Sequence, residues 1–247
     1  MFAIYKKELR SYFTTAVGYV YLGVFLAISA LLCCYTTLGA GTYDTSTYFT
    51  FIPLIFIILI PLLTMKIFSE EKKLRTEQLL LTAPVSITGM VMGKFLAAFT
   101  LFAGGLVISL VNFIPLCIYG AMDGLNDAFP ESIGPIASII FSNFLGLLLL
   151  GAAFIAVGMF VSSLTESQLS AAVITVVIIA TMLLLNLVNG FIENYIARFI
   201  ISCVSFLSRF APFQEGRFDP SALLYFVSTA GIFLFLTVRI YDKRRWS

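Results

Sequence analysis

The sequence predicts an all-α integral membrane protein with six transmembrane helices. Of its 247 residues, 60% are hydrophobic and 11% are charged, whereas soluble domains carry about 25% charged residues. Apolar runs long enough to cross a bilayer, at roughly 20 residues each, predict spans at about 16–38, 51–68, 91–119, 136–161, 169–190 and 221–240. No polar stretch is long enough to build a separate soluble core, so we expect one transmembrane domain over residues 1–247.

Residues 1–15 predict an amphipathic helix in the membrane interface. Its apolar residues recur at three- and four-residue steps, at Phe2, Tyr5, Leu9, Tyr12 and Phe13. Its charged residues are Lys6, Lys7, Glu8 and Arg10. This pattern is typical of an interfacial helix. A signal peptide is the alternative, but the apolar run that follows is too long for one and no A-x-A-like cleavage site closes it.

The spans differ in their special residues. Pro53 and Pro61 predict a kink in the second span. Gly146, Gly151 and Gly158 in the fourth span predict close approach to neighbouring helices. The segment 191–220 is too polar for a simple span and too apolar for a free loop. We interpret this outer segment as a pair of short amphipathic surface helices or as a shallow re-entrant segment.

The distribution of basic residues predicts the topology. An even number of spans places both termini on one side. Twelve of the 15 Lys and Arg residues fall on that side, namely Lys6, Lys7, Arg10, Lys66, Lys72, Lys73, Arg75, Lys94, Arg239, Lys243, Arg244 and Arg245. Only Arg198, Arg209 and Arg217 fall on the other. By the positive-inside rule, both termini are cytoplasmic.

The sequence lacks the residues that several kinds of function require. The chain has no histidine, which is the commonest metal ligand and the usual general base. The middles of the spans carry no Asp, Glu, Lys or Arg, which argues against an ion-coupled transporter or an intramembrane protease. The polar residues of the spans predict hydrogen bonds between helices, with a substrate path as the alternative: Ser109, Asn112, Ser142, Asn143, Thr175, Thr181 and Asn186. The four cysteines predict small buried side chains: Cys33, Cys34, Cys117 and Cys203.

The stretch around Gly89, Gly93 and Lys94 is close to a phosphate-binding loop but does not match one. It has three residues between the glycines where the motif needs four, and Phe95 where the motif needs Ser or Thr. We therefore expect no nucleotide site, no metal and no cofactor in this chain.

The longest polar interruption is residues 69–94, SEEKKLRTEQLLLTAPVSITGMVMGK. Pro84 disfavours helix at the residue before it, so a surface helix is expected to end near Thr82. Ser86 is then a suitable N-cap for the third span. A mixed-charge helix with a leucine ridge fits a groove on a soluble protein. The alternative is that the leucines dip into lipid and the basic residues bind anionic headgroups.

This stretch resembles the cytoplasmic loop of ABC-2-type permeases, the membrane subunits of ATP-binding-cassette exporters, and is most similar to the gliding-motility-type permeases. The shared pattern occupies residues 70–73, Thr76, Glu77, and residues 79–82, 84–86 and 93–95. The segments KKELRSYF, RFAPFQEGRFDP and RRW are also similar, so the resemblance covers the whole chain. Arg75 departs from the pattern, which has Gly there; arginine favours helix, so the surface helix is expected to start earlier than in the family.

The resemblance implies a set of partners. A cytoplasmic coupling helix in residues 69–88, between spans two and three, would sit in a cleft of an ATPase subunit that binds ATP and Mg. Its contacts would be Glu70, Glu71, Thr76, Glu77, Leu79, Leu80, Leu81 and Pro84. The N-terminal helix, with Lys6, Lys7, Glu8 and Arg10, would lie against the same subunit. A second permease chain, identical or related, would complete the transporter in a bacterial cytoplasmic membrane, with no nucleic acid partner; an auxiliary subunit with an outer domain stays open.

The leading hypothesis is therefore a permease subunit of an exporter, which is not itself an enzyme. A non-transporting membrane anchor or regulator that recruits a cytosolic ATPase is the alternative. A membrane-embedded lipid-modifying enzyme is a third possibility, but it needs clustered carboxylates or histidine near the interface. Glu166 and Glu193 are isolated in the sequence and are expected on opposite sides of the membrane.

Overall fold

The computed structural model describes residues 1–39, 44–73, 86–118, 137–189 and 205–246. Most of these residues are helical, and they contain no strand. The helices are α1 (Phe2–Thr14), α2 (Ala16–Cys33), α3 (Ser46–Thr64), α4 (Lys66–Lys73), α6 (Ile87–Ser109), α8 (Ala137–Leu164), α9 (Gln168–Asn189), α11 (Phe206–Gln214) and α12 (Pro220–Trp246). A π-helical turn, η1 (Cys34–Leu38), extends α2, and a 3₁₀ turn, η2 (Leu110–Phe113), extends α6.

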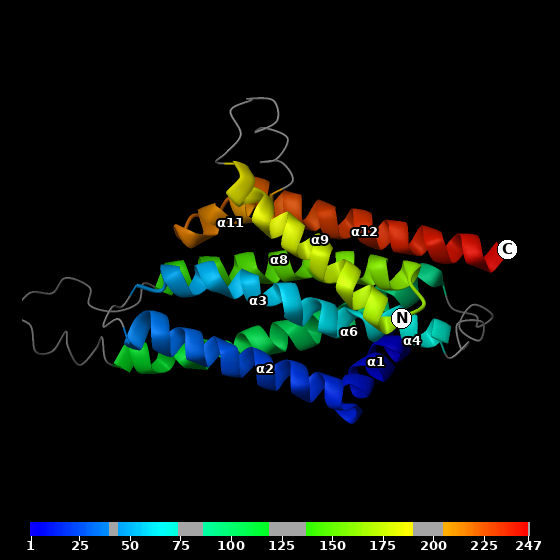
Figure 1. Cartoon of the computed structure of the whole chain (residues 1–247), viewed down its shortest axis with the longest axis horizontal. Helices are drawn as coiled ribbons and strands as arrows, with labels where there is room; N and C mark the ends of the chain where they lie inside the picture. Colours follow the sequence, from blue (N-terminus) through cyan, green and yellow to red (C-terminus); the bar gives the residue numbers. More distant parts are fainter. Residues whose placement is uncertain (40–43, 74–85, 119–136, 190–204, 247) are drawn as a thin grey trace, which may run out of the picture.

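Six helical stretches are long and apolar enough to cross a membrane, so the predicted all-helical, six-span architecture is confirmed. They are Ala16–Thr37, Ser46–Lys73, Ile87–Ile118, Ala137–Leu164, Gln168–Leu185 and Pro220–Arg245. The two termini lie at the same end of the bundle (Figure 1), as an even number of spans requires.

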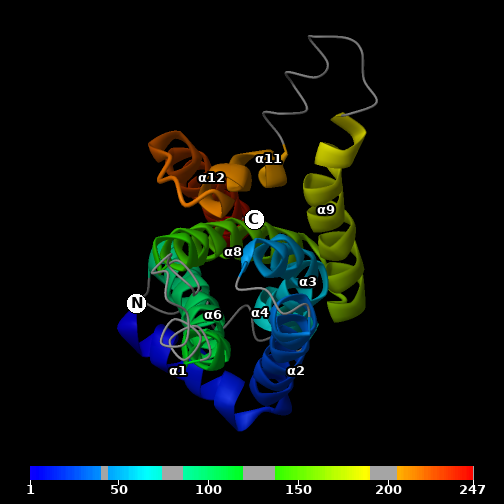
Figure 2. The same ribbon diagram turned by 90° about the vertical axis from the view of Figure 1, so that its left-hand side faces the viewer.

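Helix α8 is the centre of the bundle (Figure 2). It contacts α3, α6, α9, α11 and α12, and the residues from Ala153 to Met159 are all buried. Helices α2, α3 and α6 lie on one side of α8, and α11 and α12 lie on the other (Figures 1 and 2). A helix that is apolar all round is typical of a protein core or a membrane span, and the middle of α8 is covered by its neighbours.

The glycines of α8 permit close helix packing, as the sequence predicted. A side-chain carbon at Gly151 would overlap the ring of Phe102 on α6, and one at Gly158 would overlap the side chain of Thr64 on α3. At Gly146, the added carbon would lie 2.8 Å from the ring of Phe210 on α11. Each glycine therefore marks the line along which a different helix packs against α8.

The second span is longer than expected at both ends. Helix α3 begins at Ser46 rather than near residue 51, because the Asp44 carboxylate accepts hydrogen bonds from the Ser46 amide (2.9 Å) and hydroxyl (2.7 Å). After one non-helical residue, Met65, the chain continues as α4. The polar stretch of residues 69–94, which we call the charged stretch, therefore begins inside the packed helix α4, where Ile67, Phe68 and Ser69 are buried.

The outer segment is described in part. Helix α11 buries Phe206, Phe210 and Phe213 and packs against α8 and α9. Residues 190–204 lie outside the described part of the chain. The described helix is thus one short amphipathic element whose aromatic face is covered by the bundle.

The polar residues of the spans divide into two groups. Asn112 donates to Ser29 Oγ (2.8 Å), and Ser142 donates to the Arg217 carbonyl (3.5 Å), so these two link separate parts of the fold. The others bond carbonyls of their own helices, as Ser109, Asn143, Thr175 and Thr181 do. For Asn143, Thr175 and Thr181 the predicted bond between helices is wrong, because a carbonyl one turn back is the nearest acceptor. Ser109 also hydrogen-bonds Tyr48 of α3, as the sequence predicted. The side chain of Asn186 lies outside the described part.

The cysteines differ in how far they are exposed. Cys33 is buried, whereas Cys34 and Cys117 are exposed, so the prediction of burial is wrong for these two. Both occupy helix positions at the outer surface of the bundle, where an apolar side chain of a membrane protein can face lipid. Cys203 lies outside the described residues.

Candidate functional site

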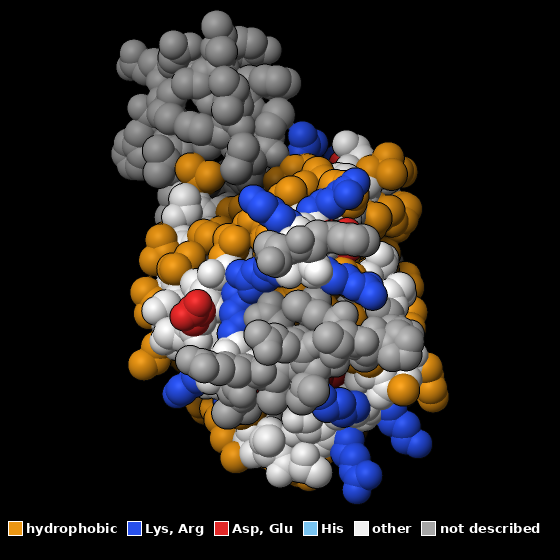
Figure 3. Space-filling view, turned by 90° about the vertical axis from the view of Figure 1, so that its right-hand side faces the viewer, with side chains coloured by type: hydrophobic (Ala, Val, Ile, Leu, Met, Phe, Trp, Pro, Cys, Tyr) orange, Lys and Arg blue, Asp and Glu red, His pale blue; other side chains and the backbone are white. Residues whose placement is uncertain are grey.

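Lysine and arginine side chains gather at the end of the bundle that carries both termini (Figure 3). The elements that meet there are α1, α4, the start of α6 and the end of α12 (Figure 1). Their basic residues are Lys6, Lys7, Arg10, Lys66, Lys72, Lys73, Lys94, Arg239, Lys243, Arg244 and Arg245. The sequence placed the coupling segment and the N-terminal helix at this end, and α1 and α4 do lie there together.

A buried lysine joins three of these elements. Lys94, two turns into α6, is only 2% exposed. Its ammonium Nζ lies 2.7 Å from Glu71 Oε1 of α4 and 3.2 Å from Glu8 Oε1 of α1. We call these three residues the Lys94 cluster. It connects the N-terminal helix, the start of the charged stretch and the third membrane span.

The ammonium of Lys94 has its hydrogen-bonding capacity fully used. An ammonium has three donors, and its third acceptor is the Ile67 carbonyl, at 2.8 Å. The ring centroid of Phe68 lies 5.1 Å from Nζ, within cation–π range. A buried charge is tolerated only when it is paired and hydrogen-bonded, and this environment meets both conditions.

Helix α4 is also fixed to the end of α8. The first amides of a helix have no partner within it, and here Ser162 Oγ accepts from the Phe68 and Ser69 amides, each at 3.2 Å. The same hydroxyl donates to the Met65 carbonyl at 3.3 Å. One buried serine of α8 therefore satisfies the backbone at the break between α3 and α4.

The other end of α4 is held by Lys72. Its ammonium donates to the carbonyls of Ser163 and Thr165, the latter at 3.3 Å. These carbonyls lie at the C-terminal end of α8, where a cation is favoured by the helix dipole. Helix α4 is thus attached to α8 near both of its ends and to α6 through Glu71.

Helix α1 packs closely on the start of α6. A side-chain carbon at Gly93 would lie 3.2 Å from the Met1 carbonyl oxygen and 3.4 Å from Ile4 Cβ. A larger residue at this position would push the α1 backbone away by a few tenths of an ångström. Further along α1, the Tyr5 hydroxyl lies 3.2 Å from Thr100 Oγ1.

A buried tyrosine holds the far end of α1. Tyr12 donates to the Leu63 carbonyl of α3 at 3.3 Å. Burial, and the negative charge of Glu8, raise the pKa of the Tyr12 hydroxyl above its ordinary value, so the proton that it donates is retained. Helix α1 therefore contacts α6 through its first turns and α3 through its last.

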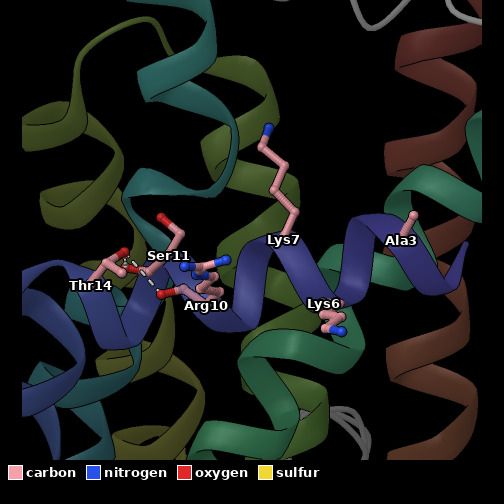
Figure 4. Close-up of a pocket in the computed structure, with 6 residues that line it drawn as sticks. All are labelled: Ala3, Lys6, Lys7, Arg10, Ser11 and Thr14. Atoms are coloured by element: carbon pink, nitrogen blue, oxygen red, sulfur yellow. Dashed lines mark hydrogen bonds between the residues drawn. The ribbon is translucent and has the colours of Figure 1, made fainter.

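The opposite face of α1 is basic and open. Lys6, Lys7 and Arg10 are exposed, together with Ser11 and Thr14 (Figure 4). These side chains line a shallow depression on the helix surface. Phe2 and Phe13 are exposed as well. Helix α1 therefore presents its basic residues away from the bundle, while Glu8 points into it.

The structure thus places the predicted site residues in different environments. Glu8 and Glu71 meet at Lys94, Glu70 is half-buried on α4, and Lys6, Lys7 and Arg10 are exposed. Thr76, Glu77, Leu79, Leu80, Leu81 and Pro84 lie outside the described residues. Ser86 accepts from the Gly89 amide at 3.3 Å, so the predicted N-cap of the third span is confirmed.

Sequence reasoning missed the role of Lys94. It counted this residue only as a basic charge of the terminal side and as part of a failed phosphate-loop motif. The available signal was its position, because Lys94 is the only charged residue in the 23 residues of α6. A single charge two turns inside an apolar helix predicts a buried partner.

Among the described residues, no three carboxylate, cysteine or histidine side chains come together as metal ligands. No protein-family model matches the sequence, and no curated protein resembles it at a significant level.

Proposed function

We propose that this chain is the permease subunit of an ATP-binding-cassette exporter, driven by a separate cytoplasmic ATPase. The observation that carries the proposal is the Lys94 cluster, which ties α1 and α4 directly to the membrane-spanning helix α6. A subunit moved by a soluble motor needs such a rigid connection between its surface elements and its spans. The resemblance of residues 70–95 to the coupling loop of ABC-2-type permeases supports the same function.

The proposed mechanism is mechanical. The ATPase, with its own ATP and Mg, contacts the segment 69–88 and the basic face of α1. Its closure displaces α4, and the displacement reaches α6 through Glu71 and Lys94 and α8 through Ser162. Because α8 packs against five other helices, a movement of its end changes the packing of the whole bundle. A second permease chain completes the path for the substrate.

The basic end of the bundle is proposed to face the cytoplasm of a bacterial cell. Basic residues of the described spans gather there, whereas Arg209 lies within α11 and Arg217 follows it, near the opposite end. The positive-inside rule then places both termini in the cytoplasm, on the side where ATP is made available to the partner.

Co-purification from the native membrane in mild detergent tests the proposal. We expect a stoichiometric subunit with a phosphate-binding loop, identified by mass spectrometry. Reconstitution of that complex then separates the two candidate functions, because an exporter shows ATP hydrolysis stimulated by its substrate and an anchor does not. A chain that purifies without any ATPase contradicts both functions.

A further inference from the structure

A groove of about 490 Å³ lies between α6 and α12, on the outside of the bundle. Its polar residues are Thr88, Arg239 and Asp242, at the start of α6 and near the end of α12. Its apolar residues, which include Met92 and Phe235, lie further along the bundle, away from the end with the termini. The groove is therefore polar at the end with the termini and apolar beyond it.

The groove covers the headgroup level and a large part of one leaflet of a bilayer. Along α12 it extends from Asp242 to Gly231, which is roughly 16 Å at the helical rise of 1.5 Å per residue. Half of the hydrocarbon core is about 15 Å. At the deep end, a side-chain carbon added to Gly231 would meet no atom within 4 Å, so the groove is open there.

The polar end carries one cation and one anion that do not neutralise each other. Within the described residues, neither Arg239 nor Asp242 takes part in an ion pair. The guanidinium of Arg239 lies 5.0 Å from the ring centroid of Phe235, which holds it over the groove wall. Because the two residues are three positions apart, they lie on the same face of α12.

We propose that this groove binds one phospholipid with a zwitterionic, primary-ammonium headgroup, such as phosphatidylethanolamine. Arg239 binds the phosphate, since a guanidinium pairs well with phosphate oxygens, and the Thr88 hydroxyl donates to the same group. Asp242 accepts hydrogen bonds from the ammonium. One acyl chain lies along Met92 and Phe235 and ends beside Gly231. This inference does not depend on the proposed exporter function.

The charge pattern selects this headgroup over the other common ones. Phosphatidylglycerol carries a phosphate but no cation, so Asp242 would be left opposite a second negative charge. Phosphatidylcholine carries a trimethylammonium, which has no N–H to donate to a carboxylate. Both lipids fill the apolar part of the groove equally well, so the discrimination lies at Asp242.

Native mass spectrometry of the full chain tests the proposal. The protein is equilibrated in mild detergent with equal amounts of phosphatidylethanolamine, phosphatidylglycerol and phosphatidylcholine that carry the same acyl chains. We expect one tightly retained phosphatidylethanolamine per chain, about threefold in excess of either competitor, as an exposed ion pair allows. Asp242→Asn removes this preference, and Arg239→Gln lowers the retention of all three lipids.

Gly231→Leu tests the acyl-chain part of the groove. Its side chain enters open space, so it fills the groove without a clash in the fold, and lipid retention falls. Gly104→Leu is the matched control, because Gly104 also has no neighbour within 4 Å of an added carbon and lies outside the groove. Retention by this control remains at the wild-type level.

Three results overturn the proposal. Equal retention of the three lipids by the wild-type chain shows unselective annular lipid. Preferential retention of phosphatidylglycerol shows an anionic-lipid site that ignores Asp242. If Gly231→Leu converts a dimer into a monomer and leaves lipid retention unchanged, a second copy of the chain occupies the groove.

Discussion

Lys94 and Glu71 form a 2.7 Å ion pair between α6 and α4, with the lysine side chain almost fully buried. The pair lies where the charged stretch leaves the membrane-spanning helices, and Glu8 of α1 completes it at 3.2 Å. The interaction therefore links three helices, and the contribution of each glutamate to stability can be measured separately.

Replacing Lys94 by Met is expected to destabilise the protein strongly. Breaking a buried ion pair from one side costs about 3–5 kcal/mol, because the remaining charges lose their partner. Here two carboxylates are left, so the thermal unfolding temperature in detergent should fall markedly. Lys73→Met is the control, since Lys73 is exposed at the end of α4 and its loss should change stability little. A Lys94→Met protein as stable as the control contradicts the cluster.

The two glutamates of the cluster should contribute unequally. Glu71 lies 0.5 Å closer to the ammonium than Glu8 does, so Glu71→Gln is expected to cost more stability than Glu8→Gln. Double-mutant cycles with Lys94→Met measure each coupling energy. A larger coupling for Glu8 would mean that α1, and not α4, is the principal partner of the buried lysine.

Ser162→Ala is expected to loosen the start of α4. The change removes the side-chain acceptor that the Phe68 and Ser69 amides share, and each unsatisfied buried group costs about 1–3 kcal/mol. Amide hydrogen exchange at these two residues should accelerate. Ser163→Ala is the matched control, because the neighbouring, equally buried Ser163 hydroxyl bonds only the Phe160 carbonyl of its own helix. Similar exchange in both variants would remove Ser162 from this role.

Gly158→Ala should destabilise the contact between α8 and α3. The added carbon overlaps Thr64, and overpacking of this kind typically costs about 1–3 kcal/mol. Gly104→Ala provides the comparison, since the new methyl group enters open space and alanine is the better helix former by about 1 kcal/mol. Thermal unfolding in detergent should therefore shift in opposite directions for the two variants.

Substitutions in the leucine-rich part of the charged stretch, Leu79 to Leu81, test the proposed function itself. Changing Leu79 and Leu80 together to Asp should release the partner ATPase, because burial of each leucine contributes about 1.5–3 kcal/mol. The measurement is ATPase recovered per permease at equal permease yield. Leu164→Asp, at an exposed position at the end of α8, controls for an added acidic charge at the same end. Retention of the ATPase by the double variant rules out this segment as the coupling helix.

The sequence predicted the architecture well because bilayer thickness sets a length that apolar runs must reach. It predicted Ser86 as an N-cap for a similarly local reason, since the cap and the Gly89 amide are three residues apart. The start of α4, in contrast, could not be predicted from local sequence. The sequence predicted that the second span ends near residue 68 and that a surface segment follows. Instead the chain continues as α4 to Lys73, and Ser162, far along the chain, accepts hydrogen bonds from the amides of the buried Phe68 and Ser69.

The Lys94 cluster could not be predicted from local sequence for the same reason, because its members lie far apart along the chain. The sequence predicted Glu8 and Glu71 as ATPase contacts and counted Lys94 only as a basic charge, and no spacing within the sequence brings the three together. Only the packing of α1 and α4 against α6 does so, through the space that Gly93 leaves for α1. Residues 74–85, which hold most of the predicted ATPase contacts, lie outside the described part, so those contacts stay predictions.

The Lys94 cluster also imposes an order on biogenesis. Glu8 and Glu71 leave the ribosome before Lys94, so both carboxylates wait without their common cation until the third span has been synthesised. Helix α1 therefore cannot reach its final position on the first span alone, because the cation that Glu8 and Glu71 share lies on the third span. The N-terminal helix, although it is made first, completes its contacts only when the third span is present.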